Sequence, residues 1–437
     1  MLFILGILFM VFGILFSIAW HELGHFMPAK KFGVKVTQFM VGFGPTMWSR
    51  QKGETEVGVK WIPAGGYIRM IGMFPPGPDG KVKASSTGRI GTLVEEARKV
   101  SQAEVLTPED EKRTFYNLSV PKKLVVMMGG PVMNLILAAI LFSIVLVGFG
   151  TPVASTTLER VPETYTASEF SGTKNGGQQA DSGKQLPGPA AQAGIKPGDT
   201  IVGYNGQAVS DWSQLSELIR STPAGPVPVE IDRNGQVQTL TIDVAQVNRQ
   251  VVVDGQTTSE VKPQGFLGIS PQIQAERQSV TAVPGYMWDL TIRSAQAIIA
   301  FPQKIAGVAQ AAFAGDERDP NGPVGVVGVG RISGEVAAEE QVPAEWRVAQ
   351  MLGILASLNL FLFLFNLIPL LPLDGGHVAG ALWEGLRRQF AKLRGRPDPG
   401  PVDVAKALPL AYGVAFLLMG MGILLVYADI VNPISLG

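Results

Sequence analysis

The sequence predicts a polytopic α-helical membrane protein with four transmembrane helices and one separate α+β module. Hydrophobic residues make up 46% of the 437 residues and charged residues only 16%, a balance typical of membrane proteins. Apolar runs of membrane-crossing length, about 20 residues, recur along the chain. They occupy residues 2–20, 124–149, 347–373 and 407–427. The polar stretch 150–285 between the second and third runs predicts the module.

The first apolar run is predicted to be a transmembrane helix and not a cleaved signal peptide. No basic residue precedes the run, and no small-residue cleavage site follows it. At 1.5 Å per residue, a helix that starts at residue 2 places His21 about 30 Å from its beginning, near the far leaflet.

A metal-binding motif, His21-Glu22-Leu23-Gly24-His25, continues this helix. Histidines at i and i+4 lie on one helix face about one turn apart, a spacing that suits two ligands of one Zn²⁺. Glu22 can act as general base toward the water that the metal activates. The chain has three histidines and no cysteine, which excludes disulfides, thiolate nucleophiles and cysteine zinc sites. The third histidine, His377, follows Asp374-Gly375-Gly376.

Asp374, at the end of the third apolar run, is predicted to be the third zinc ligand. A carboxylate there is costly unless it is paired or bound to a metal, and three protein ligands leave the fourth position of the metal to water. A helix-end cap is the alternative for an Asp before two glycines, but the HExxH motif favours the metal. Pro369 and Pro372 leave carbonyls unpaired, and Asn366 could satisfy one of them or bind a substrate carbonyl.

Two further features lie near the predicted site. Asn134 is a polar residue within the second span, so it is expected to face the bundle interior. A hydrogen bond between helices is a better prediction for it than direct catalysis. In residues 34–73, which include Gly65 and Gly66, the residue character alternates as in the strands of a β-hairpin. The hairpin either offers a strand edge to an unwound substrate near the zinc or is an ordinary cytosolic hairpin, and spacing alone does not decide.

The pattern divides the chain into segments, and the basic residues orient them. Lys30, Lys31 and Lys35 follow the first span, and further basic residues precede the second span and follow the third. Under the positive-inside rule both termini lie outside and the zinc motifs lie toward the cytosol. The segments are 1–30 (first span), 31–120 (re-entrant β region and cytosolic loop), 121–150 (second span), 151–285 (external module with an insertion at 166–188), 286–345 (amphipathic helix and linker), 346–380 (third span), 381–406 (basic cytosolic loop) and 407–437 (fourth span and tail). The net charge of zero gives no indication of nucleic-acid binding.

The module resembles a PDZ domain of the bacterial, circularly permuted kind. The resemblance is carried by residues 190–219: a short helix, the Pro197-Gly198 turn, a strand, the Asn205-Gly206 turn and an amphipathic helix that opens at Asp211-Trp212. PDZ domains bind peptide ends by strand addition, so a peptide end is an expected partner. A plug that restricts access by its bulk is the alternative.

The chain as a whole resembles the site-2 protease family of intramembrane zinc metalloproteases. His-Glu-Leu-Gly-His inside a first membrane helix carries the resemblance, together with Gly42–Pro45, Gly65–Tyr67, Gly130–Asn134 and Asn366–Gly375. The likeness is greatest to the bacterial branch with one PDZ domain, which acts in regulated intramembrane proteolysis of anti-sigma factors.

This resemblance implies a function and a set of site residues. His21, His25 and Asp374 would bind one zinc ion, and Glu22 would activate water and later protonate the leaving amine. Substrate contacts would come from Asn366, from the re-entrant hairpin at Gly65 and Gly66, and from Asn134. The substrate would be a single-pass membrane protein, similar to a pre-cleaved anti-sigma factor, in the bilayer of a bacterial plasma membrane.

Two other functions are possible: a catalytically inactive PDZ scaffold and a zinc-handling membrane protein. A transporter favours several His, Asp or Glu clusters in different spans, and only one such cluster is seen. An intact Glu22 argues against the scaffold, since a purely structural zinc site needs no general base.

Overall fold

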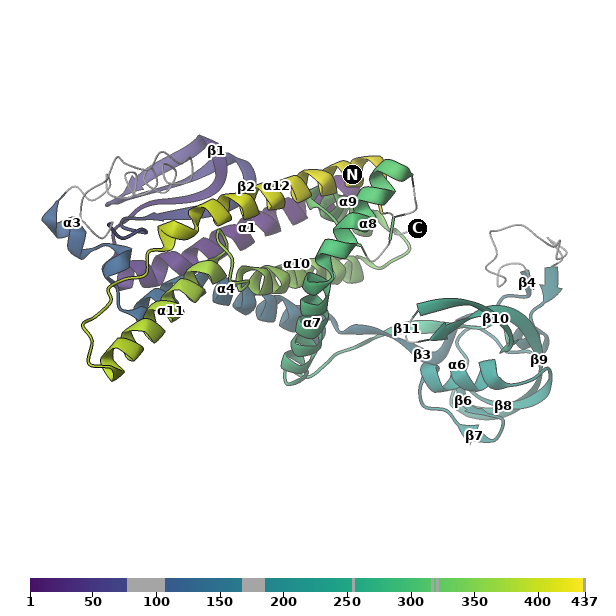
Figure 1. Cartoon of the computed structure of the whole chain (residues 1–437). Coiled ribbons are helices and arrows are strands. Elements are labelled where there is room, and N and C mark those ends of the chain that lie inside the picture. The colour runs from purple at the N-terminus through teal and green to yellow at the C-terminus, as the bar shows by residue number, and fades with distance from the viewer. Residues whose placement is uncertain (77–106, 167–184, 254–255, 316–317, 320–321, 435–437) are drawn as a thin grey trace. The chain divides into compact units, whose positions relative to one another are not determined.

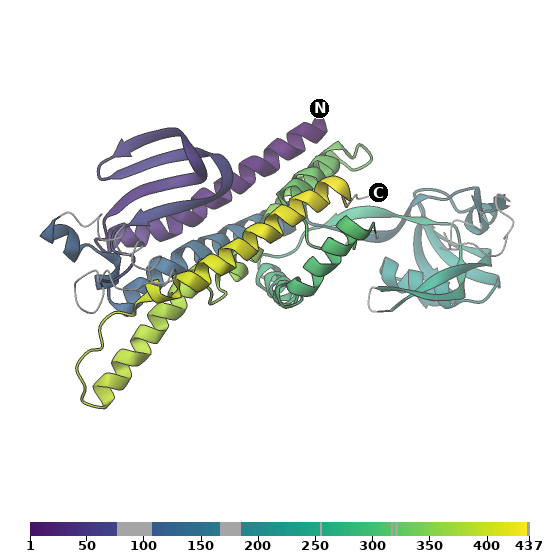
Figure 2. The same ribbon diagram turned by 45° about the horizontal axis from the view of Figure 1, so that its top comes forward.

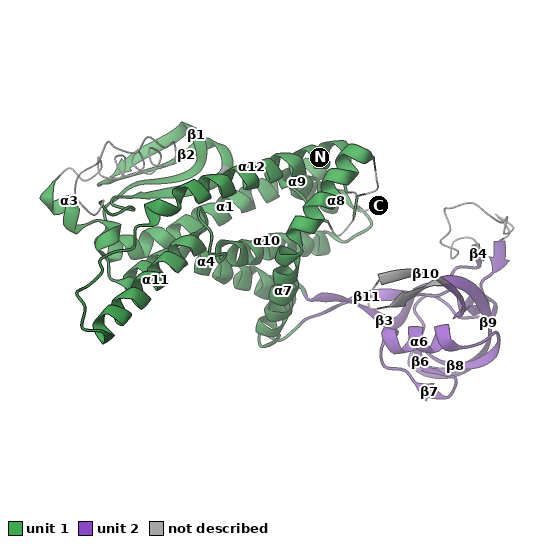
Figure 3. Ribbon diagram, viewed as in Figure 1, with its two compact units in different colours: residues 1–149, 278–437 green, residues 150–277 purple. Residues whose placement is uncertain are grey.

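The computed structural model describes residues 1–76, 107–166, 185–253, 256–315, 318–319 and 322–434. These residues form two compact units, one of residues 1–149 with 278–437 and one of residues 150–277 (Figure 3). Much of the predicted cytosolic loop (77–106) and most of the predicted insertion (167–184) lie outside the described residues.

In unit 1, four of the described helices are long and apolar enough to cross a membrane. They are α1 (Leu2–Lys31), α4 (Val120–Ser143) with its π-helical continuation η2 (Ile144–Phe149), α10 (Ala344–Asn366) and α12 (Leu408–Val431). The start of the chain and the end of α12 lie at the same end of the unit (Figures 1 and 2), as an even number of crossings requires.

The segments between the spans contain more helix than expected. The predicted amphipathic helix is a pair, α7 (Ala282–Ile299) and α8 (Phe301–Ala314), bent by 63°, and the following linker includes α9 (Val326–Ala338). The predicted basic loop begins as helix α11 (Asp374–Leu393). Apolar residues recur at helical spacing in this segment and favour a helix. The loop was predicted from the charged residues of the segment alone. Short elements complete the unit: α3 (Pro108–Lys112), η1 (Phe115–Asn117) and η4 (Val404–Ala407).

The predicted hairpin of unit 1 is an antiparallel pair, β1 (Val36–Lys52) and β2 (Thr55–Met70). Both strands are strongly bent, so the first half of β1 pairs on both sides. Met40, for example, pairs with Tyr67 on one side and with Gly58 on the other. The bent hairpin therefore forms four adjacent strand segments. It lies beside the second half of α1 (Figure 2).

Helices α1 and α4 touch at their backbones. A Cβ on Gly24 would overlap the carbonyl oxygen of Gly129, and a Cβ on Gly129 would overlap that of Gly24. Small residues at a crossing let transmembrane helices approach closely, where van der Waals packing and short polar contacts hold them together. This crossing brings the His21–His25 turn of α1 against the Gly129-Gly130 stretch of α4.

Unit 2 is a sheet of order β10-β9-β8-β6-β3-β11, with β7 paired to β6, and a helix α6 (Trp212–Ser221). Its core includes Leu158, Ile201, Leu215 and Ile231, each at most 1% exposed. The strands are β3 (Thr151–Arg160), β6 (Thr200–Tyr204), β7 (Gln207–Ala208), β8 (Gly225–Arg233), β9 (Gln236–Val253), β10 (Gln256–Phe266) and β11 (Ser270–Glu276), with a separate pair β4 (Thr164–Thr166) and β5 (Gln185–Pro187) and the short helix α5 (Pro189–Gln192). The unit ends at Arg277, earlier than the expected 285, because Gln278 already bonds to the carbonyl of Leu146 in unit 1.

Candidate metal centre

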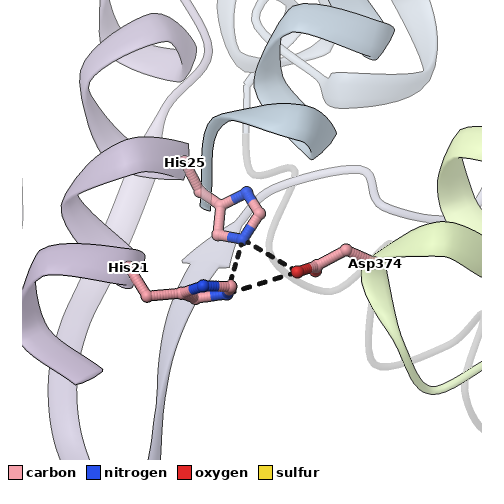
Figure 4. A group of neighbouring side chains, drawn as sticks. All are labelled: His21, His25 and Asp374. Carbon is pink, nitrogen blue, oxygen red and sulfur yellow. Dashed lines mark hydrogen bonds and ion pairs between the residues drawn. The ribbon is translucent and has the colours of Figure 1, made fainter. Parts of the chain in front are cut away.

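Three side chains from distant parts of the sequence converge in unit 1. His21 and His25 come from α1, and Asp374 is the first residue of α11 (Figure 4). Asp374 Oδ2 lies 3.2 Å from His21 Nε2 and 3.4 Å from His25 Nε2, and the two Nε2 atoms are 3.2 Å apart. In the part of the chain that the structure describes, this is the group of His, Asp and Glu residues that could hold a metal ion.

The chemistry of this group fits a zinc ion. Asp374 Oδ2 is buried and points at the Nε2 atoms of both imidazoles, and it accepts no hydrogen bond from any other described residue. A buried carboxylate is costly unless a positive charge compensates it, and a cation between the three side chains supplies that charge. Two imidazole nitrogens and one carboxylate oxygen are the ligand types of catalytic zinc sites, which keep a fourth position open.

Helix α4 orients both histidines through their other ring nitrogen. His25 Nδ1 lies 2.8 Å from the carbonyl oxygen of Val126, so an Nδ1–H donates there and Nε2 is left free for a metal. His21 Nδ1 lies 3.1 Å from the Nδ2 atom of Asn134, while Oδ1 of the same amide is buried without a partner. A half-turn of the Asn134 amide pairs Oδ1 with His21 Nδ1–H and satisfies both groups.

Gly130 of α4 leaves the space in which an ion would sit. A Cβ at this position would overlap Nε2 of His25 and lie 2.6 Å from Nε2 of His21. These are the two nitrogens that face Asp374. Any side chain at residue 130 would therefore overlap the two nitrogens that are expected to bind the metal. Gly130 belongs to one of the motifs that carry the family resemblance, but the sequence analysis assigned no role to it.

Glu22 lies between the two histidines in α1 and is 8% exposed. Its carboxyl lies close to the backbone of Ile68 in β2. A Cβ on the neighbouring Gly66 would lie 2.9 Å from Glu22 Cγ and 2.8 Å from Ile18. Gly66 thus lets the hairpin lie directly against the expected general base. Gly65 has a positive φ of +133° and faces the ring of Phe43 instead.

Of the two other predicted residues, Asn134 contacts this centre. Asn134 is 1% exposed and contacts His21, and Asn366 is the last residue of α10, partly buried, with residues 367–373 joining it to Asp374. That Asn366, Asn134 or the glycines contact a substrate stays a prediction.

The sequence analysis missed an ion pair that holds α11 against α4. Lys123 Nζ lies 2.9 and 2.8 Å from the two carboxylate oxygens of Glu384, and both side chains are at most 5% exposed. Glu384 also accepts from Arg388 and from the backbone N–H of Val402. The available signal was a Glu among apolar residues of an amphipathic segment. The basic residues before the second span, which include Lys123, were used only to orient the chain.

Comparisons with known proteins agree along the whole chain. The model of the family described as "Peptidase family M50" matches residues 9–397. "Zinc metalloprotease Rip1" of Mycobacterium bovis is 34% identical over 448 aligned positions, and the alignment covers all of both chains. The protein of the same name from Mycolicibacterium smegmatis is 33% identical over the full length of both. "Metalloprotease MmpA" of Caulobacter vibrioides is 26% identical over 88% of this chain and 89% of its own.

Proposed function

The chain belongs to peptidase family M50, and from that premise we propose that it hydrolyses a peptide bond within or near the transmembrane segment of another membrane protein. The family and the full-length relatives named zinc metalloproteases make the chain a zinc metalloprotease with Zn²⁺ as its cofactor. Its apolar helices make it a multi-pass membrane protein. The observation that carries the proposal is the convergence of His21, His25 and Asp374, beside Glu22, on helices of membrane-crossing length.

Each residue of the site has a separate role in peptide hydrolysis. A Zn²⁺ ion held by His21, His25 and Asp374 supplies the Lewis acid that activates water near neutral pH. A Glu22 carboxylate oxygen accepts a proton from the attacking water and then donates it to the leaving amide nitrogen. Asn366 holds the substrate carbonyl, and the burial of Glu22 keeps its proton from escaping to bulk water.

A substrate helix must unwind first, because its carbonyls are held in hydrogen bonds that the bilayer core cannot replace. Strand pairing with the β1–β2 hairpin offsets that loss. The close approach of Gly66 to Glu22 supports this role, since a peptide that pairs with the hairpin would pass beside the general base. Helix-breaking residues in the substrate segment are therefore expected to speed cleavage.

The chain lies in a bacterial plasma membrane with both termini outside and the metal centre toward the cytosol. Lys30 and Lys31 in the last turn of α1 support this orientation. The common end at which α1 begins and α12 ends supports one side of the membrane for both termini. Unit 2 is then external and acts as a PDZ domain. A groove of about 760 Å³ between α6 and the edge strand β10, lined by Trp212, Arg220 and Gln264, would take a peptide end. A membrane protein already cut outside, such as an anti-sigma factor, would supply that end.

Replacement of Glu22 by Gln tests the proposal. The purified variant should retain zinc and lose cleavage of a single-pass membrane reporter by about 10²-fold or more, the usual worth of a general base. Glu345→Gln, at the exposed start of α10, is the matched control and should cleave as the wild type does. Undiminished turnover in the Glu22 variant rejects the mechanism. A wild type that binds zinc without cleaving any membrane reporter indicates a scaffold, and one that moves zinc across proteoliposomes indicates zinc handling.

A further inference from the structure

Helix α11 carries a stripe of large apolar side chains on its outer side. Their exposed fractions range from 51% to 85%, and the residues are Leu382, Trp383, Leu386, Phe390 and Leu393. At about 100° per residue, the five positions fall within an arc of about 100° along the helix. A stripe of this width is a whole helix face, which singly exposed apolar residues do not make.

The opposite face of α11 is packed against α4. Ala381, Glu384 and Ala391 are buried, and Glu384 is paired with Lys123. A Cβ on Gly385 would lie 3.3 Å from Val120 at the start of α4. The helix therefore turns an ion pair inward and its apolar face outward. This is the reverse of a helix on the surface of a water-soluble protein, so water is not the medium that this outer face is built for.

Cations border the stripe. On the helix, Arg387 lies beyond one edge and Lys392 beyond the other. The guanidinium of Arg394 lies 4.1 Å from the centre of the Phe390 ring, at the end of the stripe. Between residues 382 and 396 the one acidic residue is Glu384, which is buried. Long basic side chains on both borders can keep their charges among polar headgroups while the stripe between them is immersed in apolar material.

We propose that α11 is an interfacial helix that inserts this stripe at the boundary between headgroups and acyl chains of a leaflet containing anionic phospholipids. An apolar stripe between cations is the pattern of helices that lie in this boundary. The unbalanced positive charge complements phosphate headgroups, and basic residues next to a span are attracted to an anionic leaflet. The helix also lies between α10 and α12 in the chain, so it is tethered at both ends to membrane-crossing helices.

The position of Asp374 gives this surface a consequence. Asp374 is the first residue of α11, and the Lys123–Glu384 pair fixes α11 to α4, which orients both histidines. Seating α11 in the leaflet therefore also holds the third metal ligand in place. Zinc affinity should then be higher in anionic than in neutral bilayers. This consequence rests on the proposed metal centre, whereas the lipid contact itself does not.

Spin labelling tests the contact directly. The chain contains no cysteine, so Leu386→Cys gives one nitroxide in the stripe, and Asp398→Cys gives a matched control at an exposed position beyond the helix. The full chain is placed in nanodiscs of phosphatidylcholine with or without phosphatidylglycerol. With phosphatidylglycerol, the label at 386 should collide with oxygen and lose collisions with a water-soluble nickel complex, while the label at 398 should keep them. Adding Arg387→Gln, Lys392→Gln and Arg394→Gln should restore nickel access at 386.

Each other outcome overturns the proposal. Nickel access at residue 386 in anionic nanodiscs means that the stripe faces water. Spin–spin broadening means that a second copy covers it, and an immobile label shielded from both reagents means that part of this chain covers it. Equal protection in neutral and anionic nanodiscs removes the role of lipid charge. Because no readout depends on cleavage, a failed lipid contact and a failed protease proposal are distinguishable.

Discussion

The side-chain amide of Asn134 lies 3.1 Å from Nδ1 of His21, although the two residues are 113 positions apart. Asn134 is buried on α4, and its Oδ1 atom has no partner among the described residues until the amide turns toward His21 Nδ1–H. A partner at Nδ1 decides which imidazole nitrogen carries the proton and where Nε2 points. The second span therefore contributes to the proposed metal centre without supplying a ligand.

Replacing Asn134 should weaken zinc binding. Asn134→Leu removes the acceptor at His21 Nδ1–H, and the loss of such a partner typically costs about 10–100-fold in metal affinity. Asn134→Asp keeps an acceptor oxygen and should bind zinc nearly as the wild type does. Competition with a chelator of known affinity measures both. The control is Asn359→Leu, a buried asparagine on α10 that bonds to Ser17 and not to a histidine. Equal zinc affinity in all four proteins would show that Asn134 orients nothing.

A methyl group at residue 130 should expel the metal while the fold is kept. The Cβ of Gly130→Ala would occupy the space between the Nε2 atoms of His21 and His25, so we expect bound zinc to fall to a small fraction of one ion per chain. Gly148→Ala is the control, because a Cβ at residue 148, in η2, meets nothing within 4 Å. Metal analysis after gel filtration gives the ratio. A fully loaded Gly130→Ala protein would place the ion elsewhere.

The buried pair Lys123–Glu384 should be costly to break from one side. Lys123→Met leaves the Glu384 carboxylate buried with less compensation, a situation that typically costs about 3–5 kcal/mol. The double variant Lys123→Met/Glu384→Gln removes the stranded charge and should recover much of that loss. Thermal unfolding in one detergent compares the three proteins. A double variant that is no more stable than Lys123→Met would mean that the two side chains do not act as a pair.

Asp199 should make the stability of unit 2 sensitive to acid. Burial raises the pKa of Asp199, but hydrogen bonds from Arg233 and from the backbone N–H of Lys196 outweigh it, so the pKa lies below its ordinary value of 3.8. A lowered folded-state pKa adds stability above pH 3.8 that is lost as the pH falls through the folded-state value.

Asp199→Asn should therefore destabilise unit 2 by about 1–3 kcal/mol at neutral pH. The difference from the wild type should shrink as the pH falls below 3.8, the ordinary value for the carboxyl. Hydrogen exchange of unit 2 amides in the intact chain measures it. Asp243→Asn, at an exposed position of β9, is the control. A stability difference that does not change with pH would indicate lost packing and not a lost charge.

Sequence alone was enough for those features that depend on local pattern. Apolar runs of bilayer length predicted where α1, α4, α10 and α12 lie, because the hydrocarbon core fixes the length of a crossing helix. The HExxH spacing predicted that His21 and His25 share a helix face, since the helical repeat is fixed. Asp374 was expected to join them because a carboxylate at the end of an apolar run needs a partner, and the family resemblance supported the same assignment.

Tertiary structure decided the features that depend on contacts between distant segments. The sequence carries no sign that Val126 accepts from His25, that Gly130 leaves space beside both Nε2 atoms, or that Gly66 lets the hairpin contact Glu22. Each of these depends on how closely two backbones approach. Helix α11 was missed for a related reason. Its charged residues indicated a loop on the water side, and only the packing of Glu384 against Lys123 shows which face is inside and leaves the apolar stripe outside.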